Sequence, residues 1–387
     1  MVMGQFDIEG AFLNGPLEEV LYVKDQHATG NRAWQLKKSL YSTKQAARNW
    51  NKFIDDILRG LGFAQCPDDP GFYFRKIDGS LIVLHVDDLL CAFPDTMALA
   101  EWKEALAQHL TVEDRGMPER FLGMDMVWKE GQVQISGKPV IISLADDFMI
   151  NKLAAIPYLI IEDSTELAEI KPFQILVSRL LFISRMWRPN IGYAVNQLCA
   201  RASQPRVSDV RKGCRVIVYL LGTAGEGICL RGVRKMEIDI FTDAGEEKLE
   251  EKATTGILVL LGNLPISWAA RKQDVMTLSS TEVEYIALGA GAQDGMWIAK
   301  VMEFLNKPVI PRVWTDNRGA STLSYNPDFH RRTKHIWRRH HFVKECVDDG
   351  DISVHWVPGE NNPADMLTKP VTGKRLEELK KQAGMTA

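Results

Sequence analysis

The run Leu81-Ile82-Val83-Leu84-His85-Val86-Asp87-Asp88-Leu89-Leu90 places two adjacent carboxylates inside an otherwise apolar segment. Branched apolar runs predict buried β-strands, and Asp78-Gly79, just before this run, is a strong signal for a hairpin turn. The sequence therefore predicts two antiparallel strands, residues 72–77 and 81–93, on either side of that turn. The acidic pair has two interpretations, a polar turn between strands or a pair of ligands for a cation.

A helix is expected to pack against this hairpin. Its apolar residues recur at three- and four-residue intervals, the spacing of one helix face. They are Trp50, Phe53, Ile54, Ile57, Leu58 and Leu61. Gly60 and Gly62 lie where the helix should end, because glycine readily adopts the backbone conformation that terminates helices. The first 93 residues are therefore expected to form an antiparallel sheet covered by a helix.

Length and composition describe an ordinary globular protein. The chain has 387 residues, which favours two or three domains because a domain usually contains roughly 100–200 residues. Its 45% hydrophobic and 25% charged residues exclude global disorder, collagen and coiled coil. No stretch approaches the roughly 20 apolar residues of a membrane span. Six cysteines without a C-x-x-C pair suggest neither a zinc ribbon nor a disulfide framework. We expect an intracellular protein, in cytoplasmic particles, the nucleus or both, and not a secreted one.

The remainder of the chain divides into a mainly helical part and a second part that contains strands. Residues 94–233 are expected to be helical, apart from a strand-like stretch at 121–143 with a turn at Glu130-Gly131. From about Met236 the expected order is strand 236–242, strand 254–261, helix 280–305, strand 309–315, helix 317–323, basic helix 331–347, strand 352–357 and a C-terminal helix after Pro370. Strands followed by alternating helix and strand predict a mixed sheet with helices on its faces.

Two groups of acidic residues are candidates for metal binding. Asp7 joins Asp87 and Asp88, since all three lie in or beside apolar strands. Two carboxylates about 4 Å apart repel each other by about 4 kcal/mol at an effective dielectric constant of about 20. Such a cluster therefore needs protonation or a cation, and a divalent metal ion is the simplest explanation.

The second group consists of acids at the ends of expected elements, namely Asp243, Glu282, Asp316 and Asp365. Ends of neighbouring strands and helices can converge, and carboxylate oxygens suit a hard cation such as Mg²⁺. Two structural alternatives remain open. Ser279 and Glu282 match the S-x-x-E capping box, and Asp316 could cap the helix that follows it.

Several phrases in the first part resemble, in order, the reverse transcriptase of copia-type long-terminal-repeat retrotransposons. They are Gln5-Phe6-Asp7-Ile8-Glu9-Gly10-Ala11-Phe12-Leu13-Asn14-Gly15, Lys38-Ser39-Leu40-Tyr41, Lys44-Gln45-Ala46-Ala47-Arg48-Asn49-Trp50 and His85-Val86-Asp87-Asp88. The resemblance implies a palm domain in which Asp7, Asp87 and Asp88 are the catalytic ligands of two Mg²⁺ ions, with Mn²⁺ as an alternative. It also implies that Lys44, Gln45 and Arg48 lie near the incoming deoxynucleotide or the template.

Phrases in the second part look like the ribonuclease H domain that follows reverse transcriptase in the same family. They are Thr254-Thr255-Gly256, Ser279-Ser280-Thr281-Glu282-Val283-Glu284-Tyr285, Thr315-Asp316-Asn317, Lys334-His335-Ile336 and Pro363-Ala364-Asp365-Met366-Leu367-Thr368-Lys369-Pro370. By this likeness Asp243, Glu282, Asp316 and Asp365 bind two metal ions that cleave RNA in an RNA·DNA hybrid, and Glu284 is not a ligand. The basic segment offers Lys334, His335, Arg338 and Arg339 as contacts for the hybrid's phosphates; a solvated charged face is the alternative.

The resemblance implies an α+β protein in three parts. Residues 1–93 are expected to form a reverse transcriptase palm without the family's fingers, residues 94–233 the thumb and connection, and residues 234–387 a ribonuclease H-like mixed-sheet α/β domain. The expected partners are an RNA template, a DNA primer, an RNA·DNA hybrid and other parts of a Pol polyprotein, with no membrane. Two functional hypotheses remain: an enzyme segment of a retrotransposon Pol polyprotein, or a truncated, polymerase-inactive remnant that at most binds nucleic acid.

Overall fold

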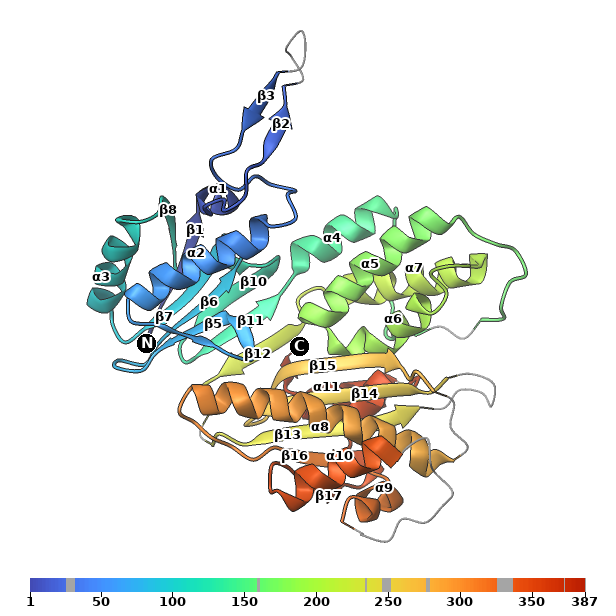
Figure 1. The fold of residues 1–387 in the computed structure, drawn as a ribbon. Helices are drawn as coiled ribbons and strands as arrows, with labels where there is room; N and C mark the ends of the chain where they lie inside the picture. The colour runs from blue at the N-terminus through green and yellow to red at the C-terminus, as the bar shows by residue number, and fades with distance from the viewer. Residues whose placement is uncertain are drawn as a thin grey trace. The chain divides into compact units, whose positions relative to one another are not determined.

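The fold was analysed in a computed structural model, which describes residues 1–25, 32–158, 161–233, 235–245, 252–275, 279–325, 337–371 and 373–386. The chain divides into two compact units (Figure 1). The first contains Met1–Pro118 and Glu303–Asn306, and the second contains Glu119–Met302 and Lys307–Ala387. Among the described residues, no helix combines the length and the apolar character needed to cross a membrane.

The first unit is built on a six-stranded antiparallel sheet in the order β4-β5-β6-β7-β1-β8. Its elements are β1 (Val2–Ile8), α1 (Ala11–Asn14), β2 (Tyr22–Lys24), β3 (Ala33–Gln35), α2 (Ala46–Gly60), β4 (Ala64–Cys66), β5 (Asp69–Arg75), β6 (Ser80–His85), β7 (Asp88–Phe93), α3 (Thr96–Ala107) and β8 (Val112–Gly116). Strands β2 and β3 form a separate two-stranded sheet. The sheet and helix expected for this region are therefore confirmed.

Helix α2 covers the sheet through one apolar face. Trp50, Ile54 and Leu58 recur every four residues and are buried against Phe6 and Tyr73 of the sheet. The helix ends at Gly60, as the sequence predicted. One expected strand is divided in two, because Val86 has a positive φ of 59° and, with Asp87, forms a tight turn between β6 and β7.

The first unit extends beyond the expected boundary at residue 93. Strand β8 pairs with β1, and Trp102 and Leu106 of α3 are buried in the same core as Phe93. Residues 94–118 therefore complete the first sheet and its core. The described backbone places them with the first unit and not with the helices that follow.

The second unit contains two five-stranded sheets with helices (Figure 1). Its elements are β9 (Arg120–Phe121), β10 (Met124–Lys129), β11 (Gln132–Ser136), α4 (Lys138–Asp147), α5 (Ile170–Met186), η1 (Pro189–Ile191), α6 (Gly192–Cys199), α7 (Val207–Gly222), β12 (Gly227–Arg231), β13 (Ile238–Gly245), β14 (Thr254–Leu261), β15 (Leu264–Lys272), α8 (Ser280–Phe304), β16 (Arg312–Thr315), α9 (Arg318–Leu323), α10 (Trp337–Asp348), β17 (Ser353–Trp356), η2 (Gly359–Asn361), η3 (Pro363–Leu367), α11 (Gly373–Gln382) and β18 (Met385–Thr386).

One sheet of this unit is mixed, as the sequence predicted. Its order is β15-β14-β13-β16-β17, with antiparallel pairing among β13, β14 and β15 and parallel pairing of β13 with β16 and of β16 with β17. The other sheet is β18-β12-β11-β10-β9 and brings the end of the chain beside β12. The strand-like interpretation of 121–143 is wrong for its last part, because Gly137 is followed by Pro139 in the first turn of helix α4.

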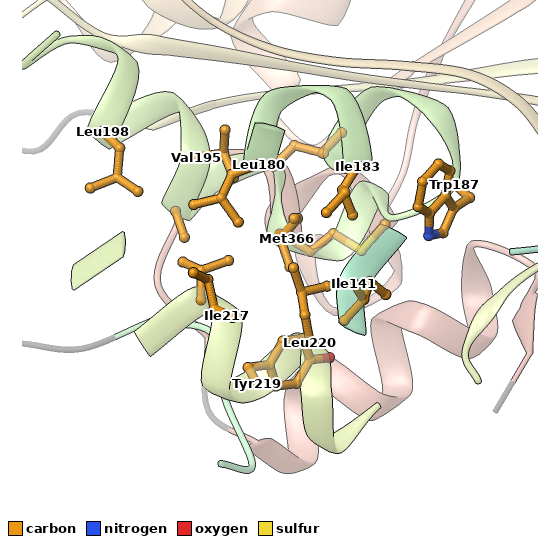
Figure 2. Close-up of a cluster of buried hydrophobic side chains, with 14 of the residues drawn as sticks. Ile141, Leu180, Ile183, Trp187, Val195, Leu198, Ile217, Tyr219, Leu220 and Met366 are labelled. Atoms are coloured by element: carbon orange, nitrogen blue, oxygen red, sulfur yellow. The ribbon is translucent and has the colours of Figure 1, made fainter. Parts of the chain in front are cut away.

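A single apolar core joins the helices to the mixed sheet. Leu180 and Ile183 of α5, Val195 of α6 and Ile217 of α7 point toward one another and toward Met366 of η3 (Figure 2). Leu258 and Leu260 of β14 belong to the same core. The expected boundary between residues 233 and 234 therefore lies inside one compact unit, since residues on both sides of it bury the same apolar surface.

We predict that Gly137→Ala destabilises this core. A Cβ atom at Gly137 would lie 2.1 Å from Cζ2 of the buried Trp187, and such overlaps typically cost about 1–3 kcal/mol. Thermal or urea denaturation of the full chain should show this loss. Gly225→Ala is the matched control, because a Cβ atom there meets nothing within 4 Å. Equal stability of the two variants would contradict the packing described around Trp187.

Candidate metal centres

Three carboxylates of the second unit converge at the mixed sheet. Asp243 lies on β13, Asp316 follows β16 directly, and Asp365 lies in η3. Strands β13 and β16 are parallel neighbours, and Thr242 of one pairs with Thr315 of the other. The residue that follows each threonine is an aspartate, so Asp243 and Asp316 lie at the same edge of the sheet. Each of the three offers one oxygen, and these oxygens lie within 4.8 Å of one another. The arrangement can hold a cation.

The turn that carries Asp365 is fixed from both sides. The Asn362 side chain donates to the carbonyl of Thr242 (2.9 Å) and accepts from the backbone N–H of Ala364 (3.2 Å). Met366 and Leu367, which follow the acid, are buried in the core. These contacts tie η3 to β13 and direct the Asp365 carboxylate toward the other two.

Two cationic side chains hold the Asp365 carboxylate. The Lys369 ammonium lies 2.8 Å from Asp365 Oδ1 and 3.1 Å from Asp243 Oδ1. The Arg375 guanidinium lies 3.2 Å from Asp365 Oδ2 and also donates to the carbonyls of Gly359 and Glu360. The Thr368 hydroxyl donates to the second oxygen of Asp243. Both oxygens of Asp243 and both of Asp365 are therefore engaged.

The charges in this site change the ionisation of its members. Asp243 is 0% exposed, and burial raises the pKa of its carboxyl group despite the nearby Lys369. Burial, together with the Asp243 carboxylate, raises the pKa of Asp316 to about 6. Burial lowers the pKa of Lys369, but the carboxylates of Asp243 and Asp365 outweigh it, so the net pKa is raised. The cluster is thus costly to ionise fully without compensating positive charge.

Glu284 of α8 is a fourth acid of this site, which the sequence prediction excluded. Burial raises the pKa of Glu284 to about 9, and the carboxylates of Asp243 and Asp316 add to the shift. Its Oε2 is buried and has no hydrogen-bond partner. An unpartnered buried carboxylate oxygen beside two other acids fits a ligand or a proton acceptor more than a structural role.

The helix face explains why Glu284 and not the predicted Glu282 approaches the cluster. Residues seven apart lie on one helix face, so Glu284 shares its face with Gly291. A Cβ atom at Gly291 would lie 2.4 Å from Thr242 Cγ2, next to Asp243, so this face meets β13. Glu282 shares its face with Gly289, whose nearest neighbour is Val343 of α10. Glu284 is therefore the acid of this helix that interacts with Asp243 and Asp316, and the assignment of Glu282 as a metal ligand stays a prediction.

The capping alternatives also have clear outcomes. The backbone N–H of Glu282 donates to the Ser279 hydroxyl (3.3 Å), which is one half of the expected capping box. The cap of α9 is Asn317, whose side chain accepts from the N–H of Ala320 (2.9 Å). Asp316 does not serve as this cap, and its carboxylate is left for the cluster.

In the first unit, strand pairing sets two of the three predicted acids opposite each other, and the third lies in the adjoining turn. Asp7 on β1 lies directly opposite Asp88 on β7, and the N–H of Ile8 donates to the carbonyl of Asp87 (2.9 Å). Burial raises the pKa of Asp88, with smaller effects from Asp87 and Asp7. Arg115 lies 3.3 Å from Asp7 Oδ1. Within the described residues, the only three-residue group whose ligand atoms all lie within 4.8 Å is the one in the second unit.

The predicted nucleic-acid contacts of the first unit lie at the start of α2. Lys44 and Arg48 are exposed, and the Gln45 amide donates to Glu19 (3.4 Å). Lys334 and His335 lie outside the described residues. Arg338 and Arg339 lie on helix α10, but their side chains are also outside the description.

We predict that Glu284→Gln stabilises the protein in a chelator at pH 8. An acid whose folded pKa of about 9 exceeds its ordinary value of 4.5 binds its proton more tightly when folded, so stability falls as pH rises between those values. Glutamine cannot ionise and avoids this loss. Each ~1 kcal/mol gained should raise Tm by roughly 2–4 °C, and the gain should shrink toward pH 5. Glu282→Gln is the matched control, and an equal gain there would contradict the assignment.

Comparisons with known proteins agree with this architecture. A family described as reverse transcriptase (RNA-dependent DNA polymerase) matches residues 1–159. The chain is 31% identical to the putative transposon Ty5-1 protein of Saccharomyces cerevisiae, over 72% of this chain and 97% of that protein. It is 29% identical to the retrovirus-related Pol polyprotein from transposon TNT 1-94 of Nicotiana tabacum, over 98% of this chain.

The chain is also similar in fold to a solved structure, and it corresponds to only part of the length of its relatives. The structure of the foamy viral protease-reverse transcriptase in complex with an RNA/DNA hybrid superposes on 96% of this chain, with a TM-score of 0.62. The match covers 45% of the viral chain, and because the sequence identity is 14% it shows a similarity of fold. The chain spans 31% of the tobacco polyprotein. The chain belongs to the Pol polyprotein family of copia-type retrotransposons, and its residues 1–159 match the family's reverse transcriptase.

Proposed function

We propose that the second unit cleaves the RNA strand of RNA·DNA hybrids with two Mg²⁺ ions held by Asp243, Asp316, Asp365 and Glu284. The observation that carries the proposal is the convergence of three carboxylate oxygens within 4.8 Å beside a fourth, buried acid. The donors are all carboxylate oxygens, which suit a hard cation such as Mg²⁺. When bound, such ions would activate the attacking water and offset charge on the leaving oxygen.

The chain's own residues position these groups. Thr368 orients the buried Asp243 through its hydroxyl, and Arg375 holds Asp365 while it is itself fixed by two backbone carbonyls. The indole of Trp356 donates to the carbonyl of Asp316 (3.0 Å). Asp243, Asp316 and Asp365 are thus each held by a neighbour that does not depend on substrate, which favours a preorganised site.

An RNA·DNA hybrid is the proposed substrate because the rim of the site suits a nucleic-acid backbone. Arg318 lies over the ring of Trp356 at 4.4 Å from its centroid, and Trp356 is 40% exposed. An exposed cation stacked on an aromatic ring beside Asp316 can contact both a phosphate and a sugar or base face. The basic residues Arg338, Arg339, Lys334 and His335 remain proposed contacts for the hybrid's phosphates.

RNA-directed DNA synthesis is proposed for the first unit. The observation that favours it is the pairing of Asp7 with Asp88 across adjacent strands, with Asp87 in the turn beside them. These acids would hold two Mg²⁺ ions, or Mn²⁺, and Lys44, Gln45 and Arg48 would lie near deoxynucleotide, primer or template. Other parts of a Pol polyprotein are proposed partners.

We predict that Asp316→Asn and Glu284→Gln each abolish magnesium-dependent cleavage of a labelled RNA·DNA hybrid. Loss of an outer-shell partner typically costs roughly 10–100-fold, so loss of a ligand should cost at least about 100-fold. Glu282→Gln should retain activity, because its helix face meets α10. Full loss in Glu282→Gln, with activity kept in Glu284→Gln, would reverse the assignment.

The same preparation separates the two functions. Primer extension on a primed RNA template should disappear in Asp88→Asn while hybrid cleavage persists, because the two carboxylate groups belong to different units. Wild-type chain that acts on neither substrate would instead favour the hypothesis of a remnant that at most binds nucleic acid.

A further inference from the structure

The ammonium group of Lys369 lies between the carboxylates of Asp243 and Asp365 and offsets their negative charge. Its ammonium lies 3.1 Å from Asp243 Oδ1 and 2.8 Å from Asp365 Oδ1, so one side chain bridges acids from β13 and η3. The second oxygen of Asp243 accepts from Thr368, and the second oxygen of Asp365 pairs with Arg375. Lys369 therefore contacts the two oxygens that are not held by these neighbours.

The two cations at this site differ in how firmly they are held. Arg375 makes two further hydrogen bonds, to the carbonyls of Gly359 (3.2 Å) and Glu360 (2.8 Å). Within the described part of the chain, the Lys369 ammonium bonds to these two carboxylates alone, and its side chain is 42% exposed. Lys369 can therefore turn into solvent without breaking a packed structure, whereas Arg375 cannot.

A divalent cation bound to the same oxygens would meet the ammonium at close range. Two positive charges at such a distance repel strongly, since both would lie within about 3 Å of the same carboxylate oxygens. A lysine has a flexible four-carbon stem and a point charge, which suits a counter-ion that comes and goes. A fixed guanidinium such as that of Arg375 suits a permanent support.

We propose that Lys369 is the internal counter-ion of the metal-free carboxylate cluster and is displaced from Asp243 and Asp365 when a divalent cation binds. The lysine thereby stabilises the fold without metal and lowers the affinity of the site for the ion. Cation binding and the lysine contacts are alternatives for the same oxygens. This inference rests on the proposed metal site at Asp243, Asp316 and Asp365.

The test measures metal binding and not activity. Mn²⁺ binding to the full chain, without nucleic acid, is followed by calorimetry for wild type, Lys369→Met and Lys374→Met. Lys374 is the matched control, an exposed lysine on α11. Coupling between two sites typically amounts to roughly 5–150-fold, so we expect Lys369→Met to bind Mn²⁺ at least about fivefold more tightly, with Lys374→Met unchanged. In a chelator, Lys369→Met should have a lower Tm than wild type.

Each outcome bears on one claim. The inference is overturned if Lys369→Met binds Mn²⁺ no more tightly than wild type does. The proposed metal site still stands in that case, provided that the binding seen in wild type disappears in Asp316→Asn. Wild-type chain without any Asp316-dependent binding overturns the proposed site and the inference together. If Lys369→Met does not fold, Lys369→Gln keeps one hydrogen bond without the charge and should again bind Mn²⁺ more tightly; equal affinity there rejects the inference.

Discussion

Repulsion among carboxylates that the fold forces together is the constraint on which the second unit depends. Parallel pairing of β13 and β16 sets Asp243 and Asp316 at one edge of the sheet, and the anchored turn η3 adds Asp365. Helix α8 adds Glu284 from the face that meets β13. Buried like charges destabilise a fold unless they are protonated or neutralised, and retaining such a cluster is typical of a site that binds cations.

The rest of the unit supports this cluster. One apolar core joins α5, α6 and α7 to β14 and η3, so the helices of residues 119–233 bury the same surface that fixes the turn of Asp365. Thr368, Lys369 and Arg375 follow within ten residues and satisfy the carboxylate oxygens from the other side. The site is thus built from segments far apart in the sequence but held by a single core.

The sequence predicted much of the fold because its signals were local. The apolar face of α2 and the glycine at its end specify that helix without help from the rest of the chain. The turn at Asp78-Gly79 specifies the hairpin of β5 and β6 in the same way. Helix α4 was missed because the apolar residues after Gly137 also fit a strand, and only Pro139 at the first turn marked a helix. Strand β8 was missed because its pairing with β1 spans most of the first unit.

The described structure brings together three of the four acids predicted for the second unit, and places Glu284 of α8 beside them. Asp243, Asp316 and Asp365 stand at the ends of elements, where side chains are expected to converge. Glu282 and Glu284 are both glutamates, two positions apart on one helix, so residue type alone does not distinguish them. The distinguishing signal was the glycine stripe at Gly291 and Gly295, seven and eleven residues beyond Glu284, which marks the face closest to the sheet. Capping motifs could not decide the matter, since Ser279 caps in either case.

The most direct test of the metal cluster is anomalous diffraction from crystals of the chain soaked in Mn²⁺. The expected result is an anomalous peak about 2.1 Å from carboxylate oxygens of Asp243, Asp316 and Asp365, with loss of that peak in Asp316→Asn. A peak found only elsewhere, or acids that lie apart with no ion between them, would contradict the central claim that these carboxylates converge to bind a divalent cation.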